Sequence, residues 1–509
     1  MKRRDFIKLS LAASGALIMP SILSADDSSS EFDDYKAIII VSLNGGNDGV
    51  NTFIPSGMDN GEYGYETYAA SRSGLAVANN DLTDKLKAAI QEDGSLLLPK
   101  DGDNIYLNGG NRLEDYTKAG FYVHDKGYNG NLNFGGNIAT HAFMPEFAHL
   151  VNQGKVAIVQ NIGNLIEPTT KKSIKDGTAN LPLFLMAHDH QSKITATANC
   201  TDLNEAGLFG RLADEWQGIN GESVYGMTIS LTPSGPTPLY GRKTTPTILD
   251  RDGIKPMATS KTRLSKFTEY ERSDPFKRYF NKIHKHSIDL VRTVTADWDN
   301  YNSIYKDLTD SYGIEINPKK ETPDSVAAFS HAWIGGWEAY ALNAAKLAKI
   351  GEDKGLKRQV FYISFSFAGF DTHGEQSRIH GTFLRRVSLA IDKLQRVLEA
   401  NSLDDKVTTM FISEFGRSIG ANGDGSDHAW GSNLCVIGGA VKGGLYGKAP
   451  SMKLGSDDDM NNKGRLIPTT SMSQYYNTVL KWFGVDENLR NKLLPELKNF
   501  EQKDLGFMG

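Results

Sequence analysis

Short runs of consecutive apolar residues recur along the chain, and several are rich in β-branched side chains. They lie at residues 37–43, 155–161, 227–231, 359–365, 407–412 and 434–437. Runs of this length are typical of strands buried on both faces of a sheet. Helical patterns lie between and around them, at 82–91, 141–152, 208–216, 274–310, 324–350, 379–400, 472–483 and 488–497. This alternation predicts an α/β fold, a three-layer sandwich whose central, largely parallel sheet is covered by helices on both sides.

The first 25 residues follow a different pattern. A basic start with Arg3 and Arg4 precedes an apolar run at 9–23 and then Ser24-Ala25. This order predicts a signal peptide that is removed near Asp26, and its apolar part is too short to span a membrane. The paired arginines followed by Phe-Ile-Lys indicate the twin-arginine export machinery, although an ordinary secretory signal would lead to the same destination. The mature protein is therefore expected to be periplasmic or otherwise extracytoplasmic.

Residues 26–509 are expected to form one domain with two insertions. Polar, Gly- and Tyr-rich segments interrupt the α/β pattern near 57–137, and a second interruption lies near 233–320. The formal net charge of −5 and the pI near 6.2 argue against a nucleic-acid partner. No later stretch has the roughly 20 apolar residues of a membrane helix. The only cysteines, Cys200 and Cys435, are expected to remain unpaired.

Acidic and imidazole side chains follow three of the predicted strands. They are Asp48 after 37–43, Asp371 and His373 after 359–365, and Glu414 after 407–412, with Asp427 and His428 in the loop that follows. Parallel strands would bring these groups to one edge of the sheet, where ligands bind in open α/β folds. Such ligands suit a divalent metal ion, Zn²⁺ first, with Ca²⁺, Mg²⁺ and Mn²⁺ as alternatives. The plainer alternative is that these residues cap turns and line solvated loops.

A further candidate site is the segment Ala187–Ser192, AHDHQS. His188 and His190 would share one side only in an extended segment, whereas on a helix they would diverge. The equally weighted alternative is a polar helix start, with Asp189 and Ser192 near the cap. The G-x-S-x-G motif of serine hydrolases is absent from the sequence.

Several motifs together resemble the DUF1501 family of exported bacterial proteins, usually grouped near the alkaline phosphatase and sulfatase superfamily. They are KRRDF, LNGGNDGVNTFIP, THAFMPEFAHLVNQGKVAIVQNIG, GLFGRL, FDTHGEQ, SEFGRSIGANGDGSDHAWG, GGAVKGGLYG and RLIPTTSMSQYYNTVLKWFGV. The resemblance implies an alkaline phosphatase-like fold with two metal ions beside a Ser, Thr or Cys nucleophile. Asp48, Asp371, His373, Glu414 and His428 match that plan in order.

The sequence departs from the superfamily plan at three positions. Phe415 stands in place of a histidine, Glu414 in place of the commoner Asp, and Ala187 where many relatives carry Ser. Ser192 is then the remaining candidate for the nucleophile.

The leading hypothesis is an exported metal-dependent hydrolase of phosphate or sulfate esters. The metal would polarise the ester oxygen while the hydroxyl of Ser192 or a water molecule attacks. Arg417 would steady the anionic group, because a guanidinium can bind two oxygens at once. The substrate would be an anionic ester, either a small molecule or a polysaccharide. The alternative is a non-catalytic exported binding or assembly protein that retains the fold with a degenerate site.

Overall fold

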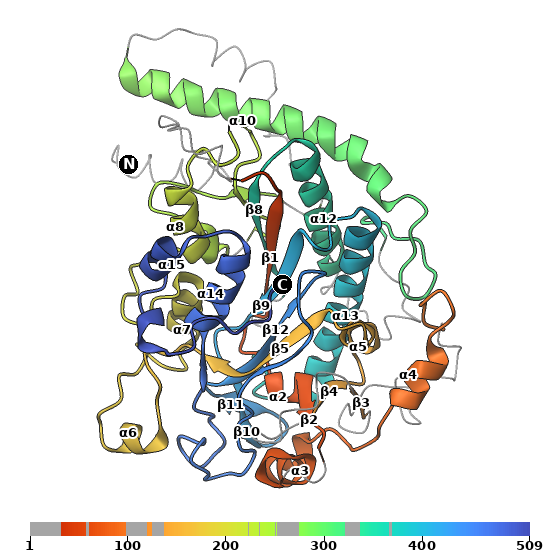
Figure 1. The fold of residues 1–509 in the computed structure, drawn as a ribbon, viewed down its shortest axis with the longest axis vertical. Coiled ribbons are helices and arrows are strands. Elements are labelled where there is room, and N and C mark those ends of the chain that lie inside the picture. Colours follow the sequence, from red (N-terminus) through yellow and green to blue (C-terminus); the bar gives the residue numbers. More distant parts are fainter. Residues whose placement is uncertain are drawn as a thin grey trace, which may run out of the picture.

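The computed structural model describes residues 32–57, 61–97, 120–124, 137–221, 223–233, 235–249, 251, 274–320, 336–365 and 369–509 (Figure 1). The predicted signal peptide lies outside these ranges, as do residues 324–335 of the helix predicted at 324–350. Both therefore stay predictions.

The centre of the described structure is a nine-stranded sheet with the order β13-β5-β12-β9-β1-β8-β6-β7, and β14 pairs with β5. Its strands are β1 (Lys36–Ser42), β5 (Val156–Gly163), β6 (Thr228–Ser230), β7 (Thr247–Ile248), β8 (Arg358–Ser364), β9 (Val407–Ile412), β12 (Ser432–Ile437), β13 (Gly444–Gly447) and β14 (Thr470–Ser471). Strand β1 lies between β8 and β9 and is parallel to both. All six predicted strands are present, and β7, β13 and β14 are strands that the apolar pattern did not predict.

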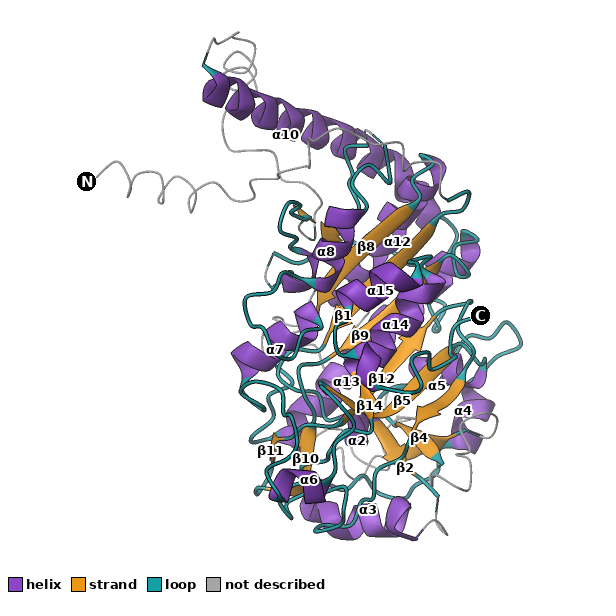
Figure 2. Ribbon diagram, turned by 60° about the vertical axis from the view of Figure 1, so that its left-hand side comes forward, coloured by secondary structure: helices purple, strands orange, loops and turns teal. Residues whose placement is uncertain are grey.

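Helices cover both faces of the sheet, which confirms the predicted three layers (Figures 1 and 2). Side chains of a strand alternate between faces, so Ile39 and Val41 of β1 pack into one core and Ile38 and Ile40 into the other. The first core includes α5 (Pro145–Asn152), α12 (Trp337–Asp353) and α13 (Gln376–Ala400). The second includes α8 (Leu208–Glu215), α14 (Met472–Trp482) and α15 (Glu487–Leu493). Burial of apolar side chains on both faces is what stabilises the sheet.

Strand β12 is the exception to the parallel arrangement. It is antiparallel to both neighbours, β5 and β9, whereas β5 is parallel to β13 and β14. The chain therefore leaves β9 at its carboxyl end and re-enters the sheet at that same edge. The connection contains a hairpin of β10 (Arg417–Ala421) and β11 (Ser426–His428). This antiparallel return keeps the loop that carries Arg417 and His428 at the carboxyl edge of the parallel strands.

The remaining elements lie at the ends of the sheet. A three-stranded sheet of β2 (Phe53–Pro55), β4 (Ile138–His141) and β3 (Phe121–Val123) packs near α2 (Gly49–Thr52), α3 (Tyr65–Arg72) and α4 (Thr83–Ala89). Helix α10 (Pro275–Asn300) extends away from the body of the molecule, as Figure 2 shows. The predicted helix 274–310 is thus shorter than expected, because a 3₁₀ turn, Tyr301–Tyr305, follows it.

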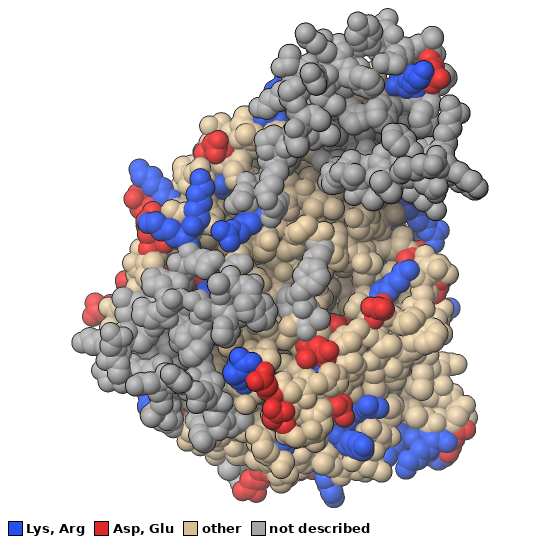
Figure 3. All heavy atoms as spheres, turned by 180° about the vertical axis from the view of Figure 1, so that it is seen from behind, with Lys and Arg blue, Asp and Glu red and all other residues tan. Residues whose placement is uncertain are grey.

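The described residues show no disulfide bond, and the face drawn in Figure 3 shows no large patch of one charge. Cys200 and Cys435 are both buried and free. On the face drawn in Figure 3, the described acidic and basic side chains are interspersed. No described helix is both long and apolar enough to cross a bilayer.

Candidate functional site

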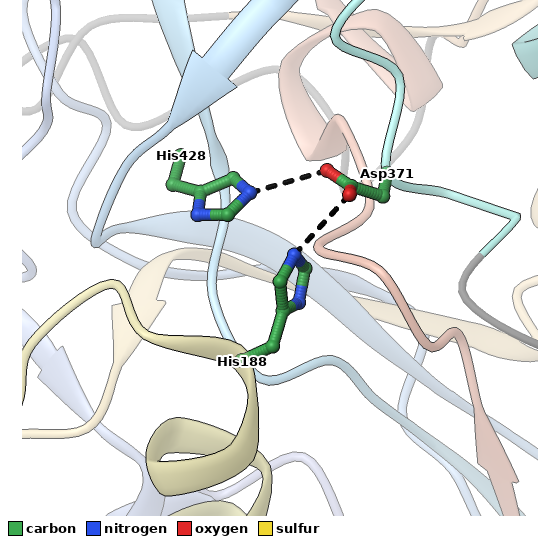
Figure 4. Close-up of side chains that lie close together, drawn as sticks. All are labelled: His188, Asp371 and His428. Atoms are coloured by element: carbon green, nitrogen blue, oxygen red, sulfur yellow. Dashed lines mark hydrogen bonds and ion pairs between the residues drawn. The ribbon is translucent and has the colours of Figure 1, made fainter.

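Three side chains from distant parts of the sequence meet at the carboxyl edge of the sheet. His188 is the first residue of α7 (His188–Thr197), Asp371 follows β8, and His428 ends β11. One ligand atom from each lies within 4.8 Å of the other two. In Figure 4 both imidazole rings point toward the Asp371 carboxylate. We call these three residues the His–Asp–His cluster.

The two strand ends behind this cluster come together at a glycine turn. Gly45, directly after β1, has a φ of 115°, and a Cβ atom there would lie 2.3 Å from the backbone nitrogen of Asp371. Its own N–H donates a 2.7 Å hydrogen bond to Oε1 of Glu414, which follows β9. The NGGNDG sequence therefore has a structural reason, since only glycine permits this approach.

His188 is held in one orientation by Glu414. Its Nδ1 lies 3.0 Å from Glu414 Oε1, so the neutral ring donates its Nδ1 proton to the carboxylate. The Nε2 atom is buried, has no hydrogen-bond partner among the described residues, and lies 3.4 Å from Asp371 Oδ2. The hydrogen bond to Glu414 raises the pKa of His188, an effect that burial opposes and the Asp371 charge assists. A positive charge is needed between Nε2 and Oδ2, and either a proton on His188 or a metal ion can supply it.

His428 shows the same arrangement. Its Nδ1 lies 2.9 Å from the carbonyl oxygen of Met186, which can only accept, so Nδ1 carries the proton. Burial lowers the pKa of His428, so the ring is neutral near pH 7 and its Nε2 lone pair is unprotonated. That lone pair lies 3.1 Å from Asp371 Oδ1. Two acceptors at this distance repel each other unless a cation or a proton lies between them.

Three further predicted residues surround the cluster. His373 Nε2 lies 2.9 Å from His428 Nε2 and 3.2 Å from Asp371 Oδ1, and its Nδ1 lies 3.5 Å from Asp427 Oδ1. Arg417 donates from Nη1 to Asp371 Oδ1 at 2.8 Å, and its side chain is fully buried. Burial alone would raise the pKa of Asp371, but the hydrogen bond from Arg417 and the Arg417 charge lower it overall. Arg417 is therefore positioned to hold Asp371 ionised and oriented.

Asp48 lies apart from these groups, although the sequence placed it among the metal ligands. Its Oδ1 accepts from the backbone N–H of Asn51 at 3.0 Å, capping α2, and its Oδ2 accepts from Arg72 and Gln376. The carboxylate and the Arg72 guanidinium are both fully buried. Burial would raise the pKa of Asp48, but the charges of Arg72 and His380 lower it overall. A buried ion pair takes up the oxygens that a metal would need.

The neighbouring His380 gives a pH-dependence that stability measurements can test. Burial lowers its pKa to about 4 from 6.5. Below pH 6.5 the unfolded chain therefore binds a proton at His380, whereas the folded chain binds that proton only below about pH 4. The fold consequently loses stability as the pH falls through this window. The expected loss in the free energy of unfolding between pH 7 and pH 4.5 is roughly 2–3 kcal/mol.

The measurement is urea unfolding of the wild type and of His380→Gln across that pH range. On acidification, the free energy of unfolding of His380→Gln should fall by roughly 2–3 kcal/mol less than that of the wild type. Equal pH slopes for the two proteins would contradict the assignment.

The AHDHQS segment forms the first turn of α7, not an extended strand, so the helix-start alternative is the one observed. His188 points into the cluster, whereas the His190 ring packs on Phe184 with 4.1 Å between centroids, and Asp189 is exposed. Ser192 lies one helical turn beyond His188 and lines a pocket together with Glu414. The two histidines diverge because helical residues two apart face different directions.

The donor set of the His–Asp–His cluster fits a metal such as Zn²⁺. Imidazole nitrogens and a carboxylate are zinc ligands, and a tetrahedral site with bonds of about 2.0–2.1 Å needs ligand atoms roughly 3.3 Å apart. The separations of 3.1 and 3.4 Å from the Asp371 oxygens to His428 Nε2 and His188 Nε2 are of that size. Metal-bound histidines also donate their other N–H to a carboxylate or carbonyl. Glu414 and the Met186 carbonyl occupy those two positions here, so Glu414 contacts the cluster as the acceptor behind His188.

Sequence reasoning missed the acceptor behind His428 and the ion-pair partner of Asp48. The carbonyl of Met186 carries no side-chain signal, and Arg72 lies in a segment that was assigned only to an insertion. Met186 has a φ of 68°, unusual for a residue other than glycine, and its neighbour Phe184 has a φ of 48°. Backbone strain of this kind is often found at functional sites, but it cannot be read from the sequence.

The site and the sheet define a three-layer α/β protein with a candidate metal centre at the carboxyl edge. Residues 335–488 match the family model described as "Protein of unknown function (DUF1501)", which confirms the resemblance over that part of the chain. The match contains Asp371 and His428 but not His188 or Asp48. No curated protein matches the chain.

Solved structures with a similar arrangement include Ps i-CgsB in complex with k-i-k-neocarrahexaose. It is 12% identical, with a TM-score of 0.29 over 70% of this chain and 71% of that chain, and Ps i-CgsB alone gives the same values. PsFucS1 sulfatase from Pseudoalteromonas sp. is 10% identical, with a TM-score of 0.28 over 68% of this chain and 63% of that chain. This chain thus spans less than two thirds of the sulfatase.

Proposed function

We propose that this protein is an exported, metal-dependent hydrolase of phosphate or sulfate esters. The observation that carries the proposal is the buried, unpartnered Nε2 of His188, which faces Asp371 while Glu414 holds the opposite side of the ring. The positive charge between His188 Nε2 and Asp371 Oδ2 is either a proton on His188 or a metal ion, and we assign it to a metal ion. The resemblance to the alkaline phosphatase and sulfatase superfamily supports ester hydrolysis as the reaction of such a centre.

His188, Asp371 and His428 would hold the metal, with His373 and Asp427 next to them as ligands of the same or a second ion. When bound, the metal would supply Lewis-acid polarisation of the ester oxygen. Arg417 would keep Asp371 ionised, and the carboxylate of Glu414 would keep the Nε2 lone pair of His188 directed at the site. The exposed hydroxyl of Ser192, one turn from His188, is the candidate nucleophile, and a water molecule is the alternative.

Hydrolysis is tested with 4-nitrophenyl phosphate and 4-nitrophenyl sulfate, using purified protein supplied in turn with Zn²⁺, Mn²⁺, Mg²⁺ and Ca²⁺. We expect turnover of at least one ester with at least one ion, and its loss with EDTA. Ser192→Ala should abolish turnover while metal content is kept if Ser192 is the nucleophile. Unchanged turnover in that variant would assign the attack to water. A protein that retains metal but cleaves neither ester contradicts the hydrolase proposal.

A second candidate function is a non-catalytic binding or assembly protein. The observation that favours it is that, within the described ranges, no Ser, Thr or Cys side chain hydrogen-bonds to His188, Asp371, His373 or His428. At the start of α7 the cap residue is Ala187, which has no side chain that could act as a nucleophile. Metal binding without turnover in the assay above would select this alternative.

Export by the twin-arginine route is expected from Arg3 and Arg4. Replacing both with lysine should leave the protein in the cytoplasm with its leader intact, because that machinery reads the arginine pair. Cell fractionation and N-terminal sequencing check this, and the exported wild type should begin near Asp26. Undisturbed export of the Lys-Lys variant would indicate the ordinary secretory route instead.

A further inference from the structure

A second feature adjoins the His–Asp–His cluster on the Glu414 side of His188. It is a pocket with an empty volume of about 590 Å³, counting its open mouth. It lies over the ends of β1, β8 and β9, and is closed by α7 and by the turn before the 3₁₀ helix Thr237–Leu239. The lining residues are Ser42, Asn44, Ser192, Thr195, Ala196, Gly235, Thr237, Pro238, Tyr362, Ile412, Ser413 and Glu414. We call this the hydroxyl pocket.

The lining of the hydroxyl pocket combines hydroxyl and amide groups with a larger apolar surface and carries no cationic side chain. Seven of its side chains end in a hydroxyl or an amide, and none is Lys, Arg or His. Ala196, Pro238 and Ile412 are the apolar residues of the lining. A site for a free phosphate or sulfate would present guanidinium, ammonium or a helix N-terminus. Several of these groups are already hydrogen-bonded within the protein, as Ser42 is to Asn44 and Ser413 is to the Leu43 carbonyl. The exposed hydroxyls of Ser192 and Thr237, beside carbon surface, suit a neutral molecule with hydroxyl groups and C–H faces.

The carboxylate of Glu414 determines which charge a ligand in the hydroxyl pocket can carry. Its side chain is only 4% exposed, and Oε1 already accepts from Gly45 and from His188. Oε2 has no hydrogen-bond partner among the described residues. A carboxylate oxygen without a proton can only accept, so Oε2 would accept a hydrogen bond from a ligand hydroxyl and would repel an anionic group.

We infer that the hydroxyl pocket binds a neutral polyol, such as one sugar ring, through Glu414 Oε2 and the hydroxyls of Ser192 and Thr237. This assignment deepens the proposed function and rests on it in one respect only: in a hydrolase, the polyol would be the alcohol part of the ester, with the anionic group at the cluster. Binding of the polyol itself requires no metal and no turnover.

In the test, the metal-free protein is titrated with four probes, and binding is monitored by saturation-transfer NMR. Methyl α-D-glucopyranoside and methyl β-D-galactopyranoside are the neutral probes, and sodium sulfate and sodium phosphate are the anions. We expect saturable binding of at least one glycoside and none of either anion. Ser192→Leu, which fills the pocket, should weaken glycoside binding at least tenfold, and Thr237→Val should weaken it less. Lys193→Leu is the matched control on the same helix, because Lys193 does not line the pocket, and it should bind like the wild type.

Failure of this inference is distinct from failure of the hydrolase proposal. No saturable glycoside binding overturns it, as does binding that Ser192→Leu and Thr237→Val leave unchanged in folded proteins of wild-type melting temperature. Binding of sulfate or phosphate that competes with the glycoside also overturns it. Glycoside binding in a protein that cleaves no ester would uphold the pocket and reject the hydrolase.

Discussion

Replacing Asp371 with alanine should lower the affinity of the protein for Zn²⁺ by more than about 100-fold. Asp371 is the one residue that both imidazoles of the cluster face, at 3.4 Å from His188 and 3.1 Å from His428. Loss of a residue behind a ligand already costs 10–100-fold in metal affinity, and Asp371 would be a ligand itself. Metal content after dialysis and a competitive chelator titration measure the change. Affinity should also fall on acidification, because the metal competes with a proton for His188.

Two variants make this experiment specific. Glu414→Gln keeps the shape behind His188 but removes the charge, so it should weaken metal binding by about 10–100-fold, less than Asp371→Ala. Asp189→Ala is the matched control, because Asp189 is the exposed acidic neighbour of His188 and is not a member of the cluster. Wild-type metal content in a folded Asp371→Ala protein would contradict the metal centre at the His–Asp–His cluster. Loss of metal in Asp189→Ala would instead support the additional site predicted at His188, Asp189 and His190.

Replacing Arg72 with methionine should reduce the free energy of unfolding by about 3–5 kcal/mol. The substitution leaves the Asp48 carboxylate fully buried without its ion-pair partner, and an uncompensated buried charge is among the most destabilising changes in a protein. Chemical denaturation at pH 7 measures the loss. Adding Asp48→Asn to the variant should recover part of it, because the second substitution removes the buried charge.

The exposed pair Lys172–Asp176 provides the control for this prediction. Its side chains are 84% and 47% exposed, so Lys172→Met should change stability by less than about 1 kcal/mol. The same experiments decide the role of Asp48. If Asp48→Asn removes bound metal and Arg72→Met leaves stability unchanged, Asp48 is a ligand as the sequence resemblance implied, and the ion pair is incidental.

The sequence by itself determined the elements of the fold. Six apolar runs were long enough for strands and too short for helices, and all six are strands of the central sheet. The helices follow because their apolar residues repeat at helical spacing, as in α13 and α14, which cover opposite faces of the sheet. Local pattern is sufficient for this, since burial on a sheet face depends mostly on the residues of the element itself.

The sequence also placed Asp371, Glu414 and His428 at one edge of the sheet. That prediction needed only the order of strands and acidic groups, provided that the strands were parallel. It could not reveal that β12 runs the other way, because strand direction depends on pairing partners far away in the chain. The direction of β12 nevertheless fixes where the β10–β11 hairpin, and therefore His428, lies.

Only the tertiary structure separated the residues that meet from those that do not. His188 was one of two equivalent histidines in the sequence, and the helical conformation of α7 turned His188 toward Asp371 and His190 toward Phe184. Asp48 follows a buried strand, as Glu414 does, but Arg72, from an insertion, pairs with its carboxylate. The role of each side chain depends on which groups from distant parts of the chain pack against it. That packing is set in three dimensions, and local sequence does not encode it.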